Sequence, residues 1–136
     1  KPMDNQLTAY TMNKGERSWS LPVGETPPIV KDNPRLRGMD IPNTGGVGHS
    51  IQLVTGDLLV QARALSAGAR QMAPDAPLML HGRDKFTGKI LGSVELPAPG
   101  QYGMMTYLHD GKQYIVVQTG SVHTGFPGSL VALALQ

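Results

Sequence analysis

Short runs of alternating apolar and polar residues, each closed by a turn signal, restrict this chain more than any other feature. Residues 7–12 alternate in this way and end at Asn13-Lys14-Gly15, beyond which residues 17–21 form a second run. Two such runs around an Asn/Gly turn predict a β-hairpin. Three further pairs of runs and a last unpaired run follow: 51–55 with 58–62, 78–82 with 90–96, 104–108 with 114–118, and 130–135. Nine short strands joined by tight turns predict an all-β fold.

Composition supports this interpretation and excludes several classes of protein. The 136 residues include 17 glycines and 11 prolines, too many for a helical bundle, and the length suits one domain. The chain has no cysteine, which rules out disulfides, thiolate metal sites and Fe–S clusters. The longest apolar run is about six residues, too short for a membrane-spanning helix. The net charge is only +2 and the basic residues are scattered, so no nucleic-acid partner is expected.

Two segments depart from the hairpin rhythm. Residues 24–47 form a long excursion rich in proline and glycine, and loops of this length are usually functional or inserted. Within it, Thr44-Gly45-Gly46 leads into a strand rather than a helix, so we interpret 44–50 as a rim loop whose glycines let the backbone approach a ligand, not as a phosphate loop. Residues 63–73 are rich in helix formers and predict a short surface helix.

An internal repeat sets the organisation of the chain. Residues 7–19 align with residues 80–92, both copies continue to Leu-Pro, and residues 130–133 match the start of the same unit. A hairpin lies between successive copies, so the unit has four antiparallel strands. The chain then divides into a half unit at 1–23, a long loop at 24–49, a full unit at 50–97 and a partial unit at 98–136.

The repeat resembles the blade-closing motif of the eight-bladed quinoprotein dehydrogenase propellers. Gly82, Asp84 and 87–89 (Thr-Gly-Lys) match that motif, and the first copy keeps Ala9 and Trp19. The stretch from Leu96-Pro97 to Gln136 is similar to the C-terminus of membrane-bound glucose dehydrogenases that depend on pyrroloquinoline quinone (PQQ). The expected fold is therefore a partial propeller of about two four-stranded antiparallel blades.

The resemblance also implies a function for the longer enzyme to which such a segment belongs. These enzymes oxidise glucose, related sugars or alcohols in the periplasm, are anchored to the inner membrane, and pass electrons to ubiquinone. They hold PQQ over Ca²⁺ or Mg²⁺, and their metal ligands and catalytic carboxylate lie in earlier blades, so we expect no catalytic or metal-binding residue here. His123, in the loop 120–125, falls where the glucose enzymes place a histidine near cofactor and sugar, and is the candidate cofactor-binding residue.

The other prominent residues have structural explanations. Trp19 is expected to anchor one blade on the next, with its N–H bonded to a backbone carbonyl. Asp84 is expected to bond the backbone of its own turn. Glycines 15, 88 and 111 fall where hairpin turns need a positive φ. His49, His81 and His109 lack the spacing of a metal site, and we interpret His81 as a packing or surface residue and His109 as a solvated turn residue.

Two alternatives remain at this point. Similar repeats build propellers that only scaffold protein complexes, and the chain is also compatible with a fragment that has no activity of its own. In either case an incomplete ring leaves strand edges exposed, so we expect self-association or pairing with the remainder of the propeller. No cofactor is expected to bind tightly to this segment alone.

Overall fold

The regular secondary structure of the described residues is almost entirely β-strand. The computed structural model describes residues 5–46, 48–64 and 77–134, and helical structure in them is limited to two single turns, α1 (Pro28–Lys31) and η1 (Pro34–Leu36). The strands are β1 (Gln6–Thr11), β2 (Glu16–Pro22), β3 (His49–Val54), β4 (Leu58–Ala64), β5 (Met79–Asp84), β6 (Ile90–Glu95), β7 (Gly100–His109), β8 (Lys112–Ser121) and β9 (Phe126–Ala134). The predicted all-β fold is confirmed.

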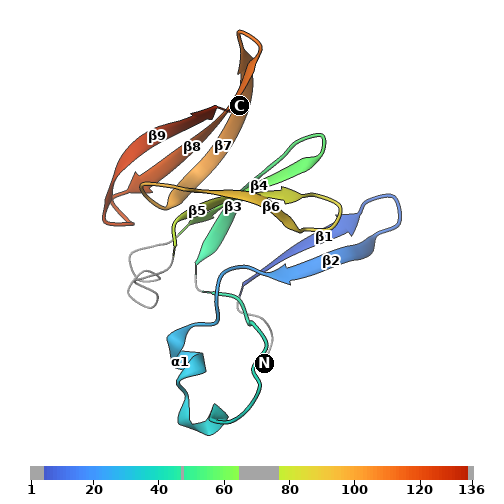
Figure 1. The fold of residues 1–136 in the computed structure, drawn as a ribbon, viewed down its shortest axis with the longest axis vertical. Helices are drawn as coiled ribbons and strands as arrows, with labels where there is room; N and C mark the ends of the chain where they lie inside the picture. Colours follow the sequence, from blue (N-terminus) through green and yellow to red (C-terminus); the bar gives the residue numbers. More distant parts are fainter. Residues whose placement is uncertain (1–4, 47, 65–76, 135–136) are drawn as a thin grey trace.

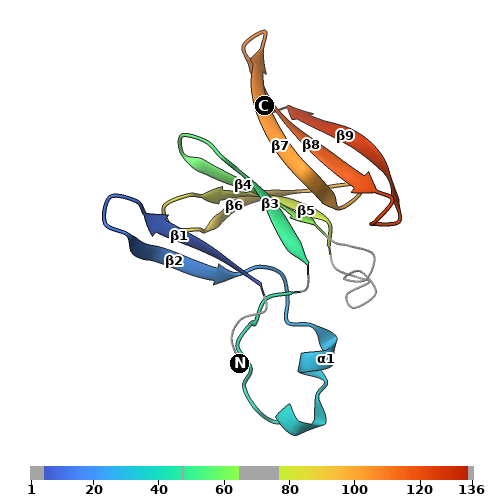
Figure 2. The same ribbon diagram turned by 180° about the vertical axis from the view of Figure 1, so that it is seen from behind.

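The strands form three antiparallel sheets that follow one another in space (Figures 1 and 2). The first sheet has the order β1-β2, the second β3-β4-β5-β6 and the third β7-β8-β9. All four predicted hairpins are present, and the last strand pairs with β8. The helix predicted for 63–73 is wrong at its start, because Arg63 and Ala64 pair with β3 at the end of β4. The rest of that segment lies outside the described residues.

The hairpin turns have the backbone conformations that their glycines predict. Gly15, Gly88 and Gly111 have φ values of 68°, 74° and 73°, a region that glycine adopts without steric cost. In the turn between β5 and β6, Asp84 Oδ1 accepts hydrogen bonds from the Thr87 N–H at 2.7 Å and the Thr87 hydroxyl at 2.9 Å. The prediction that Asp84 closes its own turn is confirmed.

Trp19 joins the first sheet to the second. Its indole Nε1–H donates a hydrogen bond to the Lys85 carbonyl, 3.1 Å away in the β5–β6 turn. A Cβ at Gly88 would lie 3.0 Å from the Trp19 ring and 2.6 Å from Leu21 Cδ1. Glycine is thus required at 88 both for its positive φ and for this close approach. The predicted anchoring role of Trp19 is confirmed.

The apolar core lies between the second and third sheets. Because side chains alternate along a strand, β4 directs Val60 and Ala62 to the side of the third sheet, where Ile115 and Val117 of β8 meet them. Gly100 lets β7 approach closely, since a Cβ there would lie 2.9 Å from the Ala62 Cβ. The buried members of this core are Val60, Ala62, Leu80, Leu96, Ile115 and Val117.

Candidate functional site

The connections between strands divide between two ends of the sheets. Consecutive strands run in opposite directions, so the turns β1–β2, β3–β4, β5–β6 and β7–β8 lie at one end (Figure 1). The connections after β2, β6 and β8 lie at the other, and we call this the connection end (Figure 2). Residues 24–46 of the long loop and the β8–β9 turn with His123 both belong to it. The structure therefore places the candidate cofactor residue at the same end as the long loop.

The β8–β9 turn holds its backbone firmly while presenting His123 to solvent. The buried Thr124 side chain donates a hydrogen bond to the Ser121 carbonyl at 2.8 Å and accepts one from the Ser121 N–H at 2.9 Å. Gly120 has a φ of 67°, and a Cβ there would meet the Pro127 carbonyl. His123 is exposed in the middle of this turn. The imidazole of His123 is therefore accessible to a ligand, and the turn that carries it is held by hydrogen bonds.

Two buried polar groups lie at the same end of the third sheet. Gln101 Nε2 and Ser121 Oγ have no hydrogen-bond partner among the described residues. The Gly120 N–H donates to the Pro99 carbonyl at 2.9 Å, which holds the start of β7 against the end of β8. Buried polar groups normally find partners, so these two are candidates for contact with a group the chain does not itself supply. The sequence gives one weak signal for Gln101: it follows a Pro-Gly pair at the start of a strand.

Gly45 and Gly46 of the long loop were expected to allow close approach of a ligand, but they contact other parts of the chain. A Cβ at Gly45 would collide with the Asn5 carbonyl, and one at Gly46 would collide with the guanidinium of Arg63. Asn43 closes the loop: its Nδ2 donates to the Gly24 carbonyl at 2.9 Å. The close approaches in this loop are thus to the protein's own backbone and side chains, because the loop folds back on Asn5, Val23 and Arg63. We correct the interpretation of these two glycines as a ligand-facing surface.

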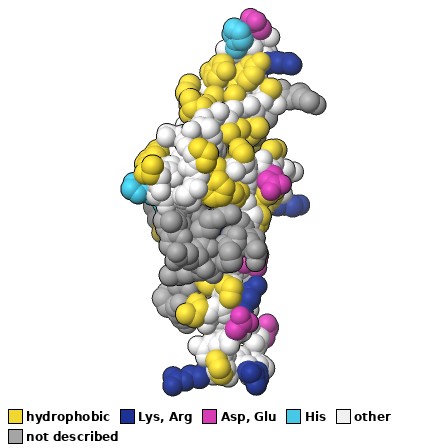
Figure 3. All heavy atoms as spheres, turned by 90° about the vertical axis from the view of Figure 1, so that its left-hand side faces the viewer, with side chains coloured by type: hydrophobic (Ala, Val, Ile, Leu, Met, Phe, Trp, Pro, Cys, Tyr) yellow, Lys and Arg dark blue, Asp and Glu magenta, His cyan; other side chains and the backbone are white. Residues whose placement is uncertain are grey.

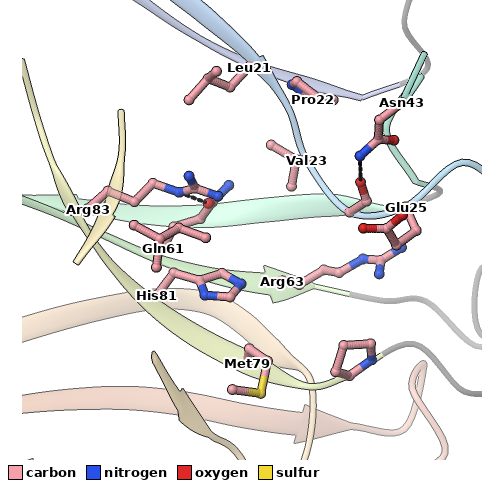
Figure 4. A pocket seen from close by; sticks show the side chains of 13 residues that line it. Leu21, Pro22, Val23, Glu25, Asn43, Gln61, Arg63, Met79, His81 and Arg83 are labelled. Carbon is pink, nitrogen blue, oxygen red and sulfur yellow. Dashed lines mark hydrogen bonds between the residues drawn. The ribbon is translucent and has the colours of Figure 1, made fainter. Parts of the chain in front are cut away.

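A pocket of about 430 Å³ opens between the end of β2 and the middle of the second sheet (Figure 4). Gln61 and Arg63 of β4 and His81 and Arg83 of β5 point into it, with Glu25 of the long loop at its edge. Burial lowers the pKa of both arginines below the usual range, and Glu25 offsets part of that effect for Arg63. The sequence did not predict this cluster of polar side chains. Alternation along a strand shows that it has a polar face, but not which neighbouring element that face contacts.

The remaining histidines are placed as follows. His81 is half-buried, its Nδ1 lies 2.7 Å from the Ser93 hydroxyl, and burial followed by the nearby Arg83 lowers its pKa. His109 is exposed at the hairpin end, with its Nε2 3.4 Å from the Asp110 carboxylate. His49 is exposed at the start of β3. The described residues contain no group of three or more His, Asp or Glu side chains arranged to hold a metal ion, and no helix in them is long and apolar enough to cross a membrane.

Comparison with known proteins identifies the family. Residues 1–115 match the family described as the PQQ glucose/ethanol/alcohol dehydrogenase β-propeller domain. The large subunit of a glycerol dehydrogenase from Gluconobacter thailandicus is 27% identical over 150 residues, which cover 99% of this chain and 17% of that subunit. The chain thus spans about a sixth of the length of this curated relative. The match over most of the chain, on a structure of successive antiparallel sheets, shows that the chain belongs to the PQQ-dependent dehydrogenase β-propeller family.

Proposed function

We propose that this chain is the C-terminal part of a PQQ-dependent enzyme that oxidises glucose, a related sugar or a polyol. The observation that carries the proposal is the family match over residues 1–115. The similarity of residues 96–136 to membrane-bound glucose dehydrogenases favours a sugar, and the relative named a glycerol dehydrogenase favours a polyol. The same resemblance supports a periplasmic location, an inner-membrane anchor and ubiquinone as electron acceptor.

The residues at the connection end fit a polar cofactor. His123 is exposed on a rigid turn, and a neutral imidazole both donates and accepts hydrogen bonds. Gln101 Nε2 and Ser121 Oγ are buried at that end without partners among the described residues, as expected if a bound group completes them. Bound PQQ, with Ca²⁺ or Mg²⁺, would supply the two-electron oxidation of the substrate carbinol. We propose that His123 orients this group, while the metal ligands and the carboxylate base belong to other blades.

The test is a calorimetric titration of the chain with PQQ in the presence of Ca²⁺ or Mg²⁺. We expect weak binding that His123→Gln lowers about fivefold to tenfold, the value of one hydrogen bond. The control is His109→Gln, which changes an exposed histidine at the opposite end of the third sheet. Equal affinities for the wild type and His123→Gln would contradict the role of His123. We expect no dye reduction with glucose or glycerol from the chain alone, since the proposed base lies elsewhere.

We further propose that the isolated chain self-associates through its third sheet. The face of this sheet turned away from the core carries Met105, Tyr107 and Leu130, which are 55%, 41% and 74% exposed. Tyr107 stacks on Tyr114 of the neighbouring strand, with ring centroids 5.1 Å apart. Figure 3 shows hydrophobic side chains gathered over the upper part of that view, where this sheet lies. Apolar faces of this kind mark interaction surfaces.

Light scattering during size-exclusion chromatography tests this surface. We expect a dimer or larger species at high concentration, and a shift to monomer in Leu130→Lys. Leu108→Lys is the matched control, because Leu108 is 72% exposed but lies at the hairpin end of the sheet. A monomer at every concentration would contradict self-association.

A further inference from the structure

The pocket between the first two sheets lies on the polar face of the second sheet. Gln61 and His81 are paired in register on β4 and β5, so their side chains share one face. Arg63 and Arg83 are each two residues further along and lie on the same face. Ile90 of β6 pairs with Arg83 and lies beside it on this face. This face meets the end of β2, whereas the opposite face of the same strands packs on the third sheet.

The hydrogen bonds of this face leave positive charge directed into the pocket. Arg83 is 8% exposed, and it donates from Nε to Gln61 Oε1 and from Nη1 to the Gly88 carbonyl, both at 2.8 Å. Gln61 in turn donates from Nε2 to the Ser50 hydroxyl at 3.2 Å, so both ends of its amide are used. Both partners of Arg83 are neutral, and no carboxylate of the described residues offsets its charge. A buried cation without a carboxylate is costly, and an anionic ligand would relieve that cost.

A second guanidinium lies across the pocket. Arg63 sits against the backbone of the long loop, where a Cβ at Gly24 would lie 3.0 Å from its Cζ. Figure 4 shows Arg63 and Arg83 on either side of His81. Glu25 is the one acidic residue among the described residues that line the pocket, and its side chain is 78% exposed. Glu25 acts electrostatically on Arg63, so the charge that no carboxylate of the described residues offsets is that of Arg83.

The rest of the pocket lining is largely apolar and comes from both sheets. Leu21 and Val23 come from the end of β2 and its continuation, Met79 from β5, and Ile90 from β6. Ligand sites of this size commonly combine apolar walls with a few polar groups that fix orientation. A ligand that fits this lining has an anionic head for a guanidinium group and a compact apolar body.

We propose that this pocket binds a small organic monocarboxylate, such as an aromatic or branched aliphatic acid. Guanidinium groups recognise carboxylates through charged N–H donors, and the apolar side chains of the lining receive the body of the acid. The site is separate from the proposed cofactor residues, because β3, the third sheet and the turn with His123 contribute nothing to its lining.

The experiment is a calorimetric titration of the chain with benzoate and with its neutral analogue benzamide. We expect saturable binding of benzoate, with benzamide at least about tenfold weaker because it lacks the charge. Ile90→Glu places a carboxylate opposite Arg83 without removing the hydrogen bonds of Arg83, and we expect it to lower benzoate affinity about tenfold. Leu91→Glu is the matched control, since Leu91 is 61% exposed on the next position of β6 and does not line the pocket.

Arg83→Gln provides a second variant, with near-ultraviolet circular dichroism as the check of its fold. Loss of benzoate binding in Ile90→Glu and Arg83→Gln, with Leu91→Glu unchanged, supports the site. Absence of benzoate binding to the wild type, equal binding of benzamide, or equal binding of inorganic phosphate would overturn it. If PQQ displaces benzoate from the wild type but not from His123→Gln, the pocket is part of the cofactor site. That result would overturn the proposal of a separate site. Because the benzoate titrations need no PQQ, failure here is distinguishable from failure of the proposed function.

Discussion

The second sheet has two interfaces of opposite character. Toward the third sheet it presents Val60, Ala62 and Leu80, which are 2%, 0% and 5% exposed, and the contact is apolar throughout. Toward the first sheet it presents Gln61 and Arg83, which are as deeply buried but are held by hydrogen bonds. The two faces come from the same strands, one residue apart.

The difference shows how one strand serves two purposes. The apolar interface gains free energy from every side chain removed from water. The polar interface depends on a few directed bonds, leaves a pocket of about 430 Å³, and joins the sheets chiefly where Trp19 meets the β5–β6 turn. We therefore expect substitutions on the apolar face to cost most stability, and those on the polar face to affect ligand binding with a smaller cost.

Leu80→Ala is expected to have the largest effect. Leu80 is 5% exposed in the apolar interface, and removing a buried leucine side chain costs about 2–5 kcal/mol. Urea unfolding followed by circular dichroism measures the change. Leu91→Ala, on an exposed face of the neighbouring strand, is the control and should change stability by less than about 0.5 kcal/mol. Similar losses in the two variants would show that the apolar interface is not the main source of stability.

Arg83→Met is expected to come next. It removes the bonds to Gln61 and to the Gly88 carbonyl, and hydrogen bonds to a charged group are each worth about 1.5–3 kcal/mol. Relief of the buried charge offsets part of this, so we expect a net loss of about 1–2 kcal/mol in the same urea experiment. A gain in stability would mean that the polar interface is maintained for binding at a cost to folding.

Trp19→Phe tests the link between the first two sheets. The substitution keeps an aromatic ring but removes the N–H that reaches the Lys85 carbonyl, for an expected loss of about 1 kcal/mol. Because Trp19 is the only tryptophan of the chain, unfolding is followed by circular dichroism. Proteolysis adds a local readout: the first sheet should be cleaved faster in the variant, while cleavage of the third sheet is unchanged. Equal acceleration at both sheets would contradict a local link.

Asp84→Asn is expected to have the smallest effect, visible in pH dependence. Hydrogen bonds from the Thr87 hydroxyl and then the Thr87 N–H hold the pKa of Asp84 below its usual value. A lowered pKa in the folded state means that the ionised carboxylate stabilises the fold above the unfolded-state pKa, and that this contribution is lost as pH falls through the folded pKa. The difference in Tm between wild type and variant should shrink between pH 7 and pH 3. A constant difference would contradict the assignment.

Much of the fold could be predicted from local signals. Alternation located all nine strands, because a half-buried strand must alternate, and the glycines at 15, 88 and 111 marked turns that need a positive φ. Asp84 was predictable because its partners lie within three residues. His123 came from the family resemblance alone, and its role stays a prediction that the titration tests. Gln101 carried no signal beyond its place after Pro-Gly.

The sequence by itself determined the strands, the turns and the division of each strand into an apolar and a polar side, because these depend on side-chain period and backbone sterics. Only the tertiary structure decided which neighbour each side meets. It brought Trp19 to the Lys85 carbonyl, 66 residues away, and folded the glycines of the long loop over Arg63. The physical reason is that a two-residue period specifies faces but not partners, and partners follow from how whole sheets stack.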